Sequence, residues 1–177
     1  MKKYIAPVLS LFLITLCVVG LLALTNRFTK GPIEAKEKEE AEKAMNMVLS
    51  GGAPFTDISE EVMKLDINTK AKLKGVSKSA KGYVFTMVAK GYGGEMVVFV
   101  GINNEGAVEN IVIGDNDETP NIGKNAELPE FTSQFTGFTR QDDIADNVDY
   151  ITRATVTTDA VISAVESALL IHAEVVK

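Results

Sequence analysis

The sequence predicts an α+β protein in which a mostly antiparallel sheet with flanking helices is preceded by one N-terminal transmembrane helix. Three observations predict this class. Residues 4–26 contain no charged side chain. Three short runs between residues 83 and 113 are apolar and rich in β-branched side chains, which is typical of strands. Apolar residues near the C-terminus recur at the spacing of an amphipathic helix.

The uncharged N-terminal run is long enough to cross a membrane, because about 20 residues with a rise of about 1.5 Å each span roughly 30 Å. We therefore expect residues 1–27 to form a transmembrane signal anchor. A cleaved signal peptide is the alternative, but its apolar region is normally shorter and no small-x-small cleavage site is evident here. Basic residues lie on both sides of the run, so their distribution does not decide the orientation. Because a short tail precedes a long domain, we expect the N-terminus inside and the domain outside.

Residues 28–50 are expected to form a linker helix, since residues 34–49 are rich in Ala, Glu, Lys and Met. The first half of this segment is a solvated run of mixed charge. The second half carries an apolar stripe, which predicts that it packs on the domain at residues 51–177. The stripe consists of Ala41, Ala44, Met45 and Val48. Two glycines, at positions 51 and 52, are expected to end the helix.

The strand-like runs are residues 83–89, 96–102 and 108–113. The second run is almost entirely apolar, which predicts a strand in the centre of the sheet. Short connections, including an Asn-Asn-Glu-Gly turn at residues 103–106, predict an antiparallel meander. Short helices are expected around residues 126–135 and 142–146, followed by the long C-terminal helix.

Composition excludes several classes of function. A formal net charge of -6 argues against nucleic acid as a partner. The single cysteine, Cys17, lies in the apolar N-terminal run, and the single histidine, His172, lies on the C-terminal helix. A zinc or iron–sulfur site built from these residue types is therefore not expected, and His172 is interpreted as a packed or half-exposed helix residue. Phosphate-loop and Rossmann glycine signatures are absent from the sequence.

The most informative stretch is residues 149–158, which run directly into the C-terminal amphipathic helix. It places the hydroxyl of Thr155 at a helix start, where free backbone N–H groups and a partial positive charge favour a phosphate. Threonines are also common as helix N-caps, so an ordinary cap is the alternative interpretation. The capping candidates are Thr157, Thr158 and Asp159.

Two earlier stretches combine turn-forming residues with side chains that suit a ligand. Residues 117–123, Asp-Glu-Thr-Pro-Asn-Ile-Gly, follow the third strand-like run and include Glu118 and Thr119. Residues 91–94, Gly-Tyr-Gly-Gly, lie between the first two runs and predict a hairpin turn. Tyr92 in this turn could stack on an aromatic ligand, although a tyrosine at the rim of the domain is the more usual explanation.

Together these stretches resemble, in order, the motifs of the FMN-binding domain family. That family includes the G subunit of the Rnf ion-translocating electron-transport complex and the C subunit of the sodium-pumping NADH:quinone reductase. Its attachment motif is roughly Asp-x-x-Ser/Thr-Gly-Ala-Thr, and the last threonine carries FMN through a phosphoester bond. By this resemblance FMN is covalently attached to Thr155, and Asp149, Thr152 and Ala154 complete the match. Residues 131–137 also resemble a family segment that ends in Gln-Phe-x-Gly.

The sequence departs from the family pattern at three positions. Arg153 replaces the glycine of the attachment motif, where glycine serves a positive φ or a close approach. An arginine could instead pair with the phosphate. Asn121 replaces a glycine in the second stretch, which is a mild change because Asn tolerates left-handed backbone. Asn116 stands where relatives often have histidine.

The resemblance implies a flavin-carrying electron-transfer subunit of a membrane ion-translocating oxidoreductase, with no independent substrate turnover and therefore no catalytic or metal-binding residue. The implied partners are other membrane subunits of a redox-driven ion pump, the membrane itself, and a flavin transferase that uses FAD and magnesium. The implied location is the inner (cytoplasmic) membrane, with one pass and the C-terminal domain on the extracytoplasmic side. The expected cofactor-binding residues are Thr155, Thr152, Ala154, Asp149, Arg153, Glu118, Thr119, Tyr92 and Gly93.

Two alternatives remain open at this point. The chain could be a membrane-anchored, non-redox binding or assembly module whose flavin site has been lost. It could also bind FMN non-covalently at the same loops.

Overall fold

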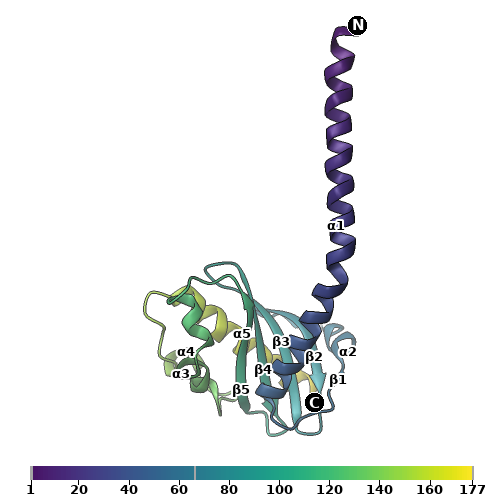
Figure 1. Ribbon diagram of the computed structural model, residues 1–177. Coiled ribbons are helices and arrows are strands. Elements are labelled where there is room, and N and C mark those ends of the chain that lie inside the picture. The colour runs from purple at the N-terminus through teal and green to yellow at the C-terminus, as the bar shows by residue number, and fades with distance from the viewer. Residues whose placement is uncertain (1, 66, 177) are drawn as a thin grey trace. The chain divides into compact units, whose positions relative to one another are not determined.

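The first element is a long helix, α1, which runs from Lys2 to Val48 (Figure 1). The computed structural model describes residues 2–65 and 67–176. The chain divides into two compact units, one ending at Ala41 and the other beginning at Glu42, so α1 contributes to both. Two prolines, Pro7 and Pro32, lie inside the helix. Its large apolar side chains between residues 8 and 24 are exposed, and the helix is long and apolar enough to cross a membrane.

The second unit is built on one antiparallel sheet of five strands in the order β1-β2-β3-β4-β5. The three strands expected from the sequence are present as β3 (Gly82–Lys90), β4 (Glu95–Asn103) and β5 (Val108–Asn116). They form a meander in which Phe85 pairs with Val100 and Val100 with Ile111. The predicted meander is therefore confirmed. Strand β4 lies inside the sheet between β3 and β5, while β3 is the middle strand of the five.

The sheet extends beyond the predicted strands at one edge. The additional strands are β1 (Thr56–Asp57) and β2 (Lys72–Lys78), and a short helix α2 (Ser59–Met63) precedes β2. The β2 sequence Lys-Leu-Lys-Gly-Val-Ser-Lys has three lysines and only one fully buried residue, Val76. A strand with so few apolar residues lacks the hydrophobic run by which strands are recognised in a sequence. It forms nevertheless, because part of its stability comes from backbone pairing with β3.

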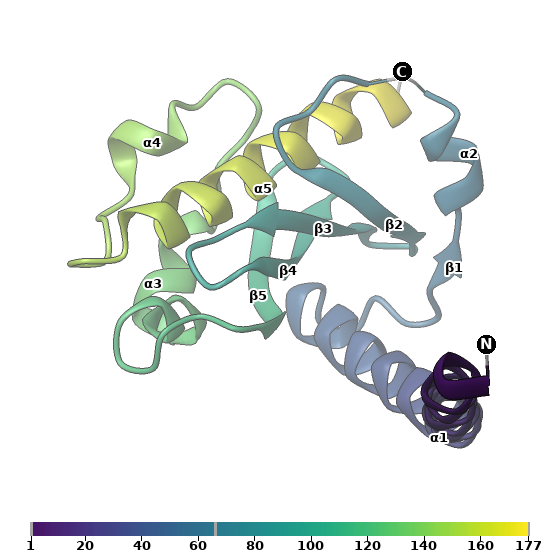
Figure 2. The ribbon, with the colours of Figure 1, turned by 90° about the horizontal axis from the view of Figure 1, so that it is seen from above.

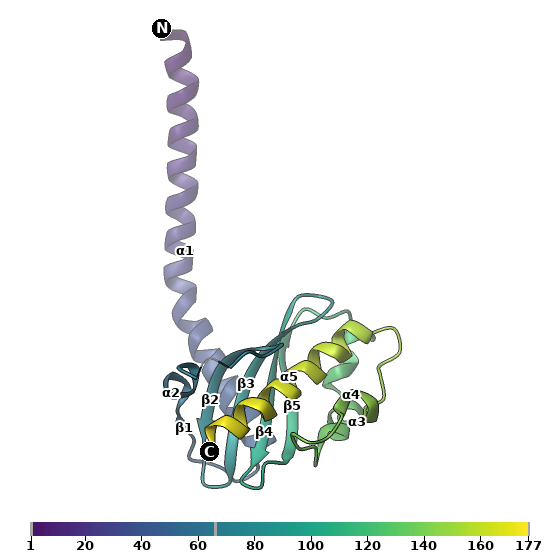
Figure 3. The same cartoon turned by 180° about the vertical axis from the view of Figure 1, so that it is seen from behind.

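The C-terminal helix α5 (Thr155–Val175) lies across one face of the sheet, as the views in Figures 2 and 3 show. Its length and composition also suit a membrane span, but its apolar face is buried in the second unit. The core that it forms with alternate residues of β3 and β4 includes Val161, Val165, Phe85 and Val100, each fully buried. Alternate side chains of the strands and the side chains at helical spacing on α5 thus face the same core.

The last turns of α1 cover the opposite face of the sheet. Ala44 and Val48 of the predicted stripe are buried, which confirms that this part of the helix packs on the domain. The approach is close: a Cβ at Gly101 of β4 would overlap with the backbone oxygen of Val48. Asn110 of β5 also donates a side-chain hydrogen bond to the backbone oxygen of Met47, at 3.2 Å. The helix ends at Val48, shortly before Gly51, whose φ is 67°.

Short helical segments complete the second unit where the sequence predicted them. The segment expected around residues 126–135 is divided into η1 (Gly123–Glu127), α3 (Pro129–Thr132) and η2 (Ser133–Phe135). The next is α4 (Ile144–Asn147). Phe131 and Phe135 are buried and meet edge to face, with ring centroids 5.3 Å apart. These aromatic contacts attach the segment to the core.

His172 is buried in this core. It is 6% exposed and meets the rings of Tyr83 and Phe85 edge to face, at centroid distances of 5.4 and 6.1 Å. Burial lowers the pKa of the imidazole below its usual value, because the charged form is poorly solvated there. Within the part of the chain that the structure describes, its Nε2 has no hydrogen-bond partner. The histidine is therefore a neutral core residue, in line with the packed interpretation.

Candidate functional site

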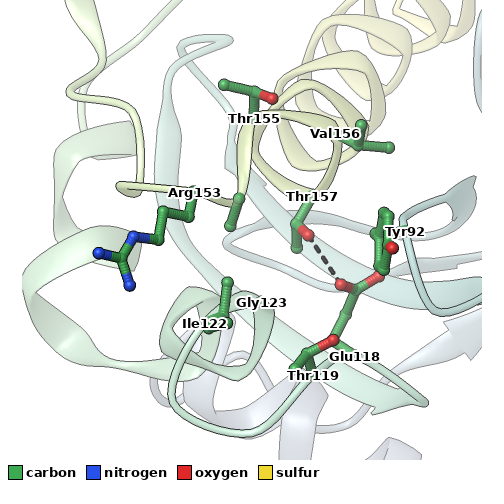
Figure 4. Close-up of a pocket in the computed structure, with 10 residues that line it drawn as sticks. Tyr92, Glu118, Thr119, Ile122, Gly123, Arg153, Thr155, Val156 and Thr157 are labelled. Atoms are coloured by element: carbon green, nitrogen blue, oxygen red, sulfur yellow. Dashed lines mark hydrogen bonds between the residues drawn. The ribbon is translucent and has the colours of Figure 1, made fainter.

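A cavity of about 410 Å³ opens where the first turn of α5 meets two loops of the sheet (Figure 4). One loop is the β3–β4 hairpin at residues 91–94, and the other is the segment 117–123 that follows β5. The lining residues are Tyr92, Glu118, Thr119, Ile122, Gly123, Arg153, Ala154, Thr155, Val156 and Thr157. The three stretches singled out in the sequence therefore converge on one site.

The hairpin brings an aromatic side chain to the mouth of the cavity. Gly91 N–H donates to the Gly94 carbonyl at 2.8 Å, which confirms the predicted turn. A Cβ at Gly93 would overlap with the backbone oxygen of Asp117, so glycine allows the two loops to touch. Tyr92, between these glycines, is 76% exposed. Its ring is available to a ligand without displacement of any core residue.

The loop after β5 is anchored by Asn116, which is buried. Its Oδ1 accepts a hydrogen bond from Glu118 N–H at 3.2 Å, and its Nδ2 donates to Glu127 Oε1 at 2.9 Å. Lys124 Nζ donates to the Asn116 carbonyl at 2.9 Å. These bonds hold the backbone from which the Glu118 side chain enters the cavity wall. Asn116 itself is not a lining residue.

The first turn of α5 presents unpaired backbone donors to the cavity. The Thr158 N–H bonds to the Ala154 carbonyl at 2.9 Å, so the N–H groups of residues 155–157 come before the first helical hydrogen bond. Ala154 occupies the N-cap position, where no side chain caps the helix. Thr155 is the first helical residue, and its side chain is exposed. The partial positive charge of a 21-residue helix therefore faces the cavity.

The alternative of an ordinary threonine cap is not what the structure shows. Thr158 Oγ1 donates back to the Ala154 carbonyl at 3.0 Å and accepts the Ile151 N–H at 3.2 Å. Thr157 Oγ1 donates instead to Glu118 Oε2 at 2.7 Å. Asp159 accepts a hydrogen bond from Tyr150. All three capping candidates are thus engaged elsewhere, which leaves the helix start open to an anion.

Both departures from glycine in the family motifs fall on left-handed backbone. Arg153 has a φ of 67° and Asn121 a φ of 60°, and they are the two non-glycine residues with positive φ in the described part of the chain. Left-handed backbone is unfavourable for residues that have a Cβ, but Asn tolerates it better than most of them. The conformation that glycine would serve is therefore retained in spite of the substitution. In Figure 4 the guanidinium of Arg153 extends away from Glu118, along the side of the cavity where Ile122 lies.

Six of the nine predicted cofactor-binding residues line the cavity: Tyr92, Glu118, Thr119, Arg153, Ala154 and Thr155. Gly93 contributes from behind the wall, because its N–H donates to Glu118 Oε1 at 3.0 Å. Asp149 and Thr152 do not line the cavity. Asp149 borders a separate hollow of about 250 Å³, and its N–H bonds to Gln134 Oε1 at 2.7 Å. Thr152 is exposed on the turn before α5.

Sequence reasoning did not single out Ile122, Gly123, Val156 and Thr157 as lining residues. For Thr157 a signal was present: it lies two residues after Thr155 on a helix, so its side chain points about 200° around the axis, toward the interior. The partner that it finds there, Glu118, lies 39 residues away in the sequence. Only the fold brings these two residues together.

Comparison with known proteins agrees with this geometry. Residues 91–170 match the FMN-binding domain family, and this segment contains every residue that lines the cavity. The chain is 29% identical to the G subunit of the Na(+)-translocating ferredoxin:NAD(+) oxidoreductase complex of Acetobacterium woodii, over 93% of this chain and 89% of the relative. It is 27% identical to the G subunit of the ion-translocating oxidoreductase complex of Methanosarcina acetivorans, over 95% of this chain and 94% of the relative.

A further relative is the G subunit of the ion-translocating oxidoreductase complex of Vibrio cholerae, which is 28% identical over 86% of this chain and 83% of its own length. The chain thus resembles the FMN-binding domain family and, along most of its length, the G subunits of ion-translocating oxidoreductases. This confirms the resemblance that the sequence motifs indicated.

Proposed function

With this resemblance as the premise, we propose that the chain is the flavin-carrying electron-transfer subunit of a membrane ion-translocating oxidoreductase complex. FMN occupies the cavity at the start of α5 and is joined to Thr155 through a phosphoester. The bound flavin supplies the redox chemistry, and the protein fixes its position and electrostatic surroundings.

One observation carries this proposal. The exposed hydroxyl of Thr155 begins an uncapped 21-residue helix and shares one cavity with Tyr92 and the Glu118–Thr119 loop. A single ligand can therefore contact the helix start, the loop and the hairpin at once. The volume of about 410 Å³ also falls in the range of roughly 300–1,000 Å³ that is usual for small-molecule sites.

The residues at the cavity suit the two ends of FMN differently. The free N–H groups of residues 155–157 and the helix dipole favour a phosphate at the helix start. The interaction of an anion with the helix dipole contributes roughly 0.3–1 kcal/mol. Arg153 adds a guanidinium, a good partner for phosphate oxygens. Tyr92 and Ile122 offer an aromatic face and an apolar surface to the ring system. The donor set therefore fits a phosphorylated aromatic cofactor.

Attachment requires a separate flavin transferase that uses FAD and magnesium. In this step Thr155 Oγ attacks the phosphorus on the flavin side of FAD. A new O–P bond forms, the phosphoanhydride bond breaks, AMP leaves, and the hydroxyl proton passes to a base of the transferase. The exposure of Thr155 leaves its hydroxyl accessible to such an enzyme.

In this proposal the N-terminal part of α1 anchors the chain in the membrane, and the second unit lies on the extracytoplasmic side. Residues 1–27 are the anchor, residues 28–50 the linker helix and residues 51–177 the FMN-binding domain in this proposal. A single anchor cannot form an ion path, so the ion is carried by other membrane subunits of the complex. A covalent link prevents loss of the cofactor from a domain outside the cytoplasm.

The test is the intact mass of the full-length chain after co-expression with a flavin transferase. We expect an adduct of one FMN phosphoester, which Thr155→Ala abolishes and Thr155→Ser retains, because serine keeps the hydroxyl. Fluorescence of the denatured chain on a gel distinguishes ester-linked flavin from FMN that is bound non-covalently. An unmodified, colourless chain would contradict the proposal and support a non-redox assembly module.

A further inference from the structure

The feature that the proposed function leaves unexplained is a buried acid in the cavity wall. Among the described residues that line the cavity, Glu118 is the only acid, and it is 3% exposed. Burial of a charged group costs free energy unless its oxygens accept hydrogen bonds. Here Oε1 accepts the Gly93 N–H at 3.0 Å and Oε2 accepts the Thr157 hydroxyl at 2.7 Å. Both oxygens are acceptors, as in a carboxylate.

Three chain segments are packed around this one carboxylate. A Cβ at Gly91 of the hairpin or at Gly123 of the following loop would overlap with the oxygens of Glu118. Thr157 brings the first turn of α5 to the same group, as Figure 4 shows. The hairpin, the loop and the helix therefore meet at Glu118, and the two glycines leave the space that its side chain fills.

We infer that Glu118 is a positioning residue for the flavin, and that its negative charge in the cavity wall disfavours flavin reduction. It joins the hairpin that carries Tyr92 to the helix turn that carries Thr155. Reduction adds electrons to the ring system, and a nearby negative charge opposes this gain in electron density. This inference rests on the proposed function.

The same geometry excludes Glu118 as a ligand of the phosphate. A carboxylate repels a phosphate, and both of its oxygens already accept hydrogen bonds from the protein. The phosphate is left to the N–H groups of α5 and to Arg153. Glu118 is thus assigned a role as a charged residue of the cavity wall and not as a ligand of the phosphate.

Glu118→Gln tests the role of the charge. The amide keeps the shape of the side chain: its oxygen accepts the Gly93 N–H, and its NH₂ group donates to Thr157, whose hydroxyl can turn to accept. We expect the full-length variant to fold, to take up FMN and to show a more positive midpoint potential than the wild type in a spectroelectrochemical titration. The matched control is Asp117→Asn, which removes an equal charge from an exposed neighbour and should give a smaller shift.

Thr157 variants test the positioning role without any flavin. In the unloaded full-length chain, Thr157→Val leaves Glu118 Oε2 without its donor and should lower the melting temperature, whereas Thr157→Ser keeps the hydroxyl and should not. The loss caused by Thr157→Val should be smaller when Glu118→Gln is also present. An unbonded neutral amide costs less than an unbonded carboxylate.

Three results would overturn this inference: a Glu118→Gln chain that does not fold, a potential that moves no more than in Asp117→Asn, or a Thr157→Val chain as stable as Thr157→Ser. Failure of the proposed function is recognised separately. A wild-type chain that takes up no FMN refutes that function, and the inference about the potential with it. A wild-type chain that takes up FMN while Glu118→Gln leaves its potential unchanged refutes this inference alone.

Discussion

Arg153 shows how one residue carries two opposed requirements. Its backbone is left-handed, with a φ of 67°, which glycine would adopt without strain. Its guanidinium is the only positively charged group among the described residues that line the cavity. A residue in a costly conformation at a binding site is consistent with a role that glycine cannot fill. In the proposed function, stability and cofactor binding therefore favour different residues at this position.

We predict that Arg153→Gly raises the free energy of unfolding by about 0.5–1 kcal/mol. Left-handed backbone costs a residue with a Cβ about 1–2 kcal/mol, and the greater freedom of glycine in the unfolded chain offsets part of that gain. Urea denaturation of the unloaded chain measures the change. Asn121→Gly is the matched comparison and should gain less, because Asn tolerates positive φ. A destabilised Arg153→Gly variant would show that the side chain makes a stabilising contact.

His172 predicts a pH dependence of stability near neutrality. Burial lowers the pKa of the folded state below 6.5, so below about pH 6.5 the unfolded chain binds more protons than the folded chain. The contribution of the neutral histidine is therefore complete above pH 6.5 and is lost as the pH falls toward the folded-state pKa. The slope is at most about 1.4 kcal/mol per pH unit.

His172→Phe is the test variant, because phenylalanine keeps the aromatic contacts with Tyr83 and Phe85 and does not titrate. Urea midpoints measured at about pH 7.5, 6.5 and 5.5 should decline for the wild type and stay nearly level for His172→Phe. His172 is the only histidine of the chain, so no second imidazole contributes. Equal slopes in the two proteins would contradict this prediction.

At the scale of elements, the end of α1 and strand β4 illustrate a close approach that depends on a missing side chain. A Cβ at Gly101 would overlap with the backbone oxygen of Val48, which cannot move without displacing the helix. Gly101→Ala should therefore lower the free energy of unfolding of the second unit by about 1–3 kcal/mol, as overpacking usually does. Thermal denaturation followed by circular dichroism measures this loss.

The control for Gly101 is Gly75→Ala on strand β2. A Cβ there meets only a side-chain atom, the Ser59 hydroxyl, at 3.2 Å, and no backbone atom. The two substitutions add the same methyl group to strands of the same sheet. If they cost the same, the docking of α1 on β4 is looser than the structure shows.

Elements with a strong hydrophobic pattern were predictable from the sequence, and elements without one were not. Strands β3, β4 and β5 are apolar and form where expected. Strand β2 carries polar and charged residues between and beside its few apolar ones, so its strand state is decided by pairing with β3. The backbone hydrogen bonds that make β2 a strand come from β3, so no pattern within residues 72–78 could have revealed this strand.

At the scale of the whole molecule, the chain combines an apolar helix with a domain that has its own core. The second unit begins at Glu42 and contains the sheet, α5 and the cavity. In the proposed function, the apolar helix holds the chain at the membrane and the domain carries the flavin. The proposed function also places the domain on the far side of the cytoplasmic membrane, so the domain has to be translocated.

We therefore predict that the domain lies on the extracytoplasmic side. In spheroplasts of a bacterium that expresses the full-length chain, protease added outside should degrade the domain while a cytoplasmic marker protein survives. Long domains are translocated largely regardless of their charge, so the basic residues that follow the anchor do not prevent this orientation. A domain that is cleaved only after lysis would place it inside.

The sequence by itself determined the attachment candidate, because Thr155 stands where the motif order and the helical pattern coincide, and it is the first residue of α5. The family resemblance also marked positions 121 and 153 as places where glycine is usual, and the structure shows that both have positive φ. Only the tertiary structure decided that Thr157 bonds to Glu118, that the helix start stays uncapped, and that Asp149 and Thr152 lie outside the cavity. These outcomes depend on hydrogen bonds and burial between segments far apart in the chain, and such contacts exist only once the sheet and α5 have packed together.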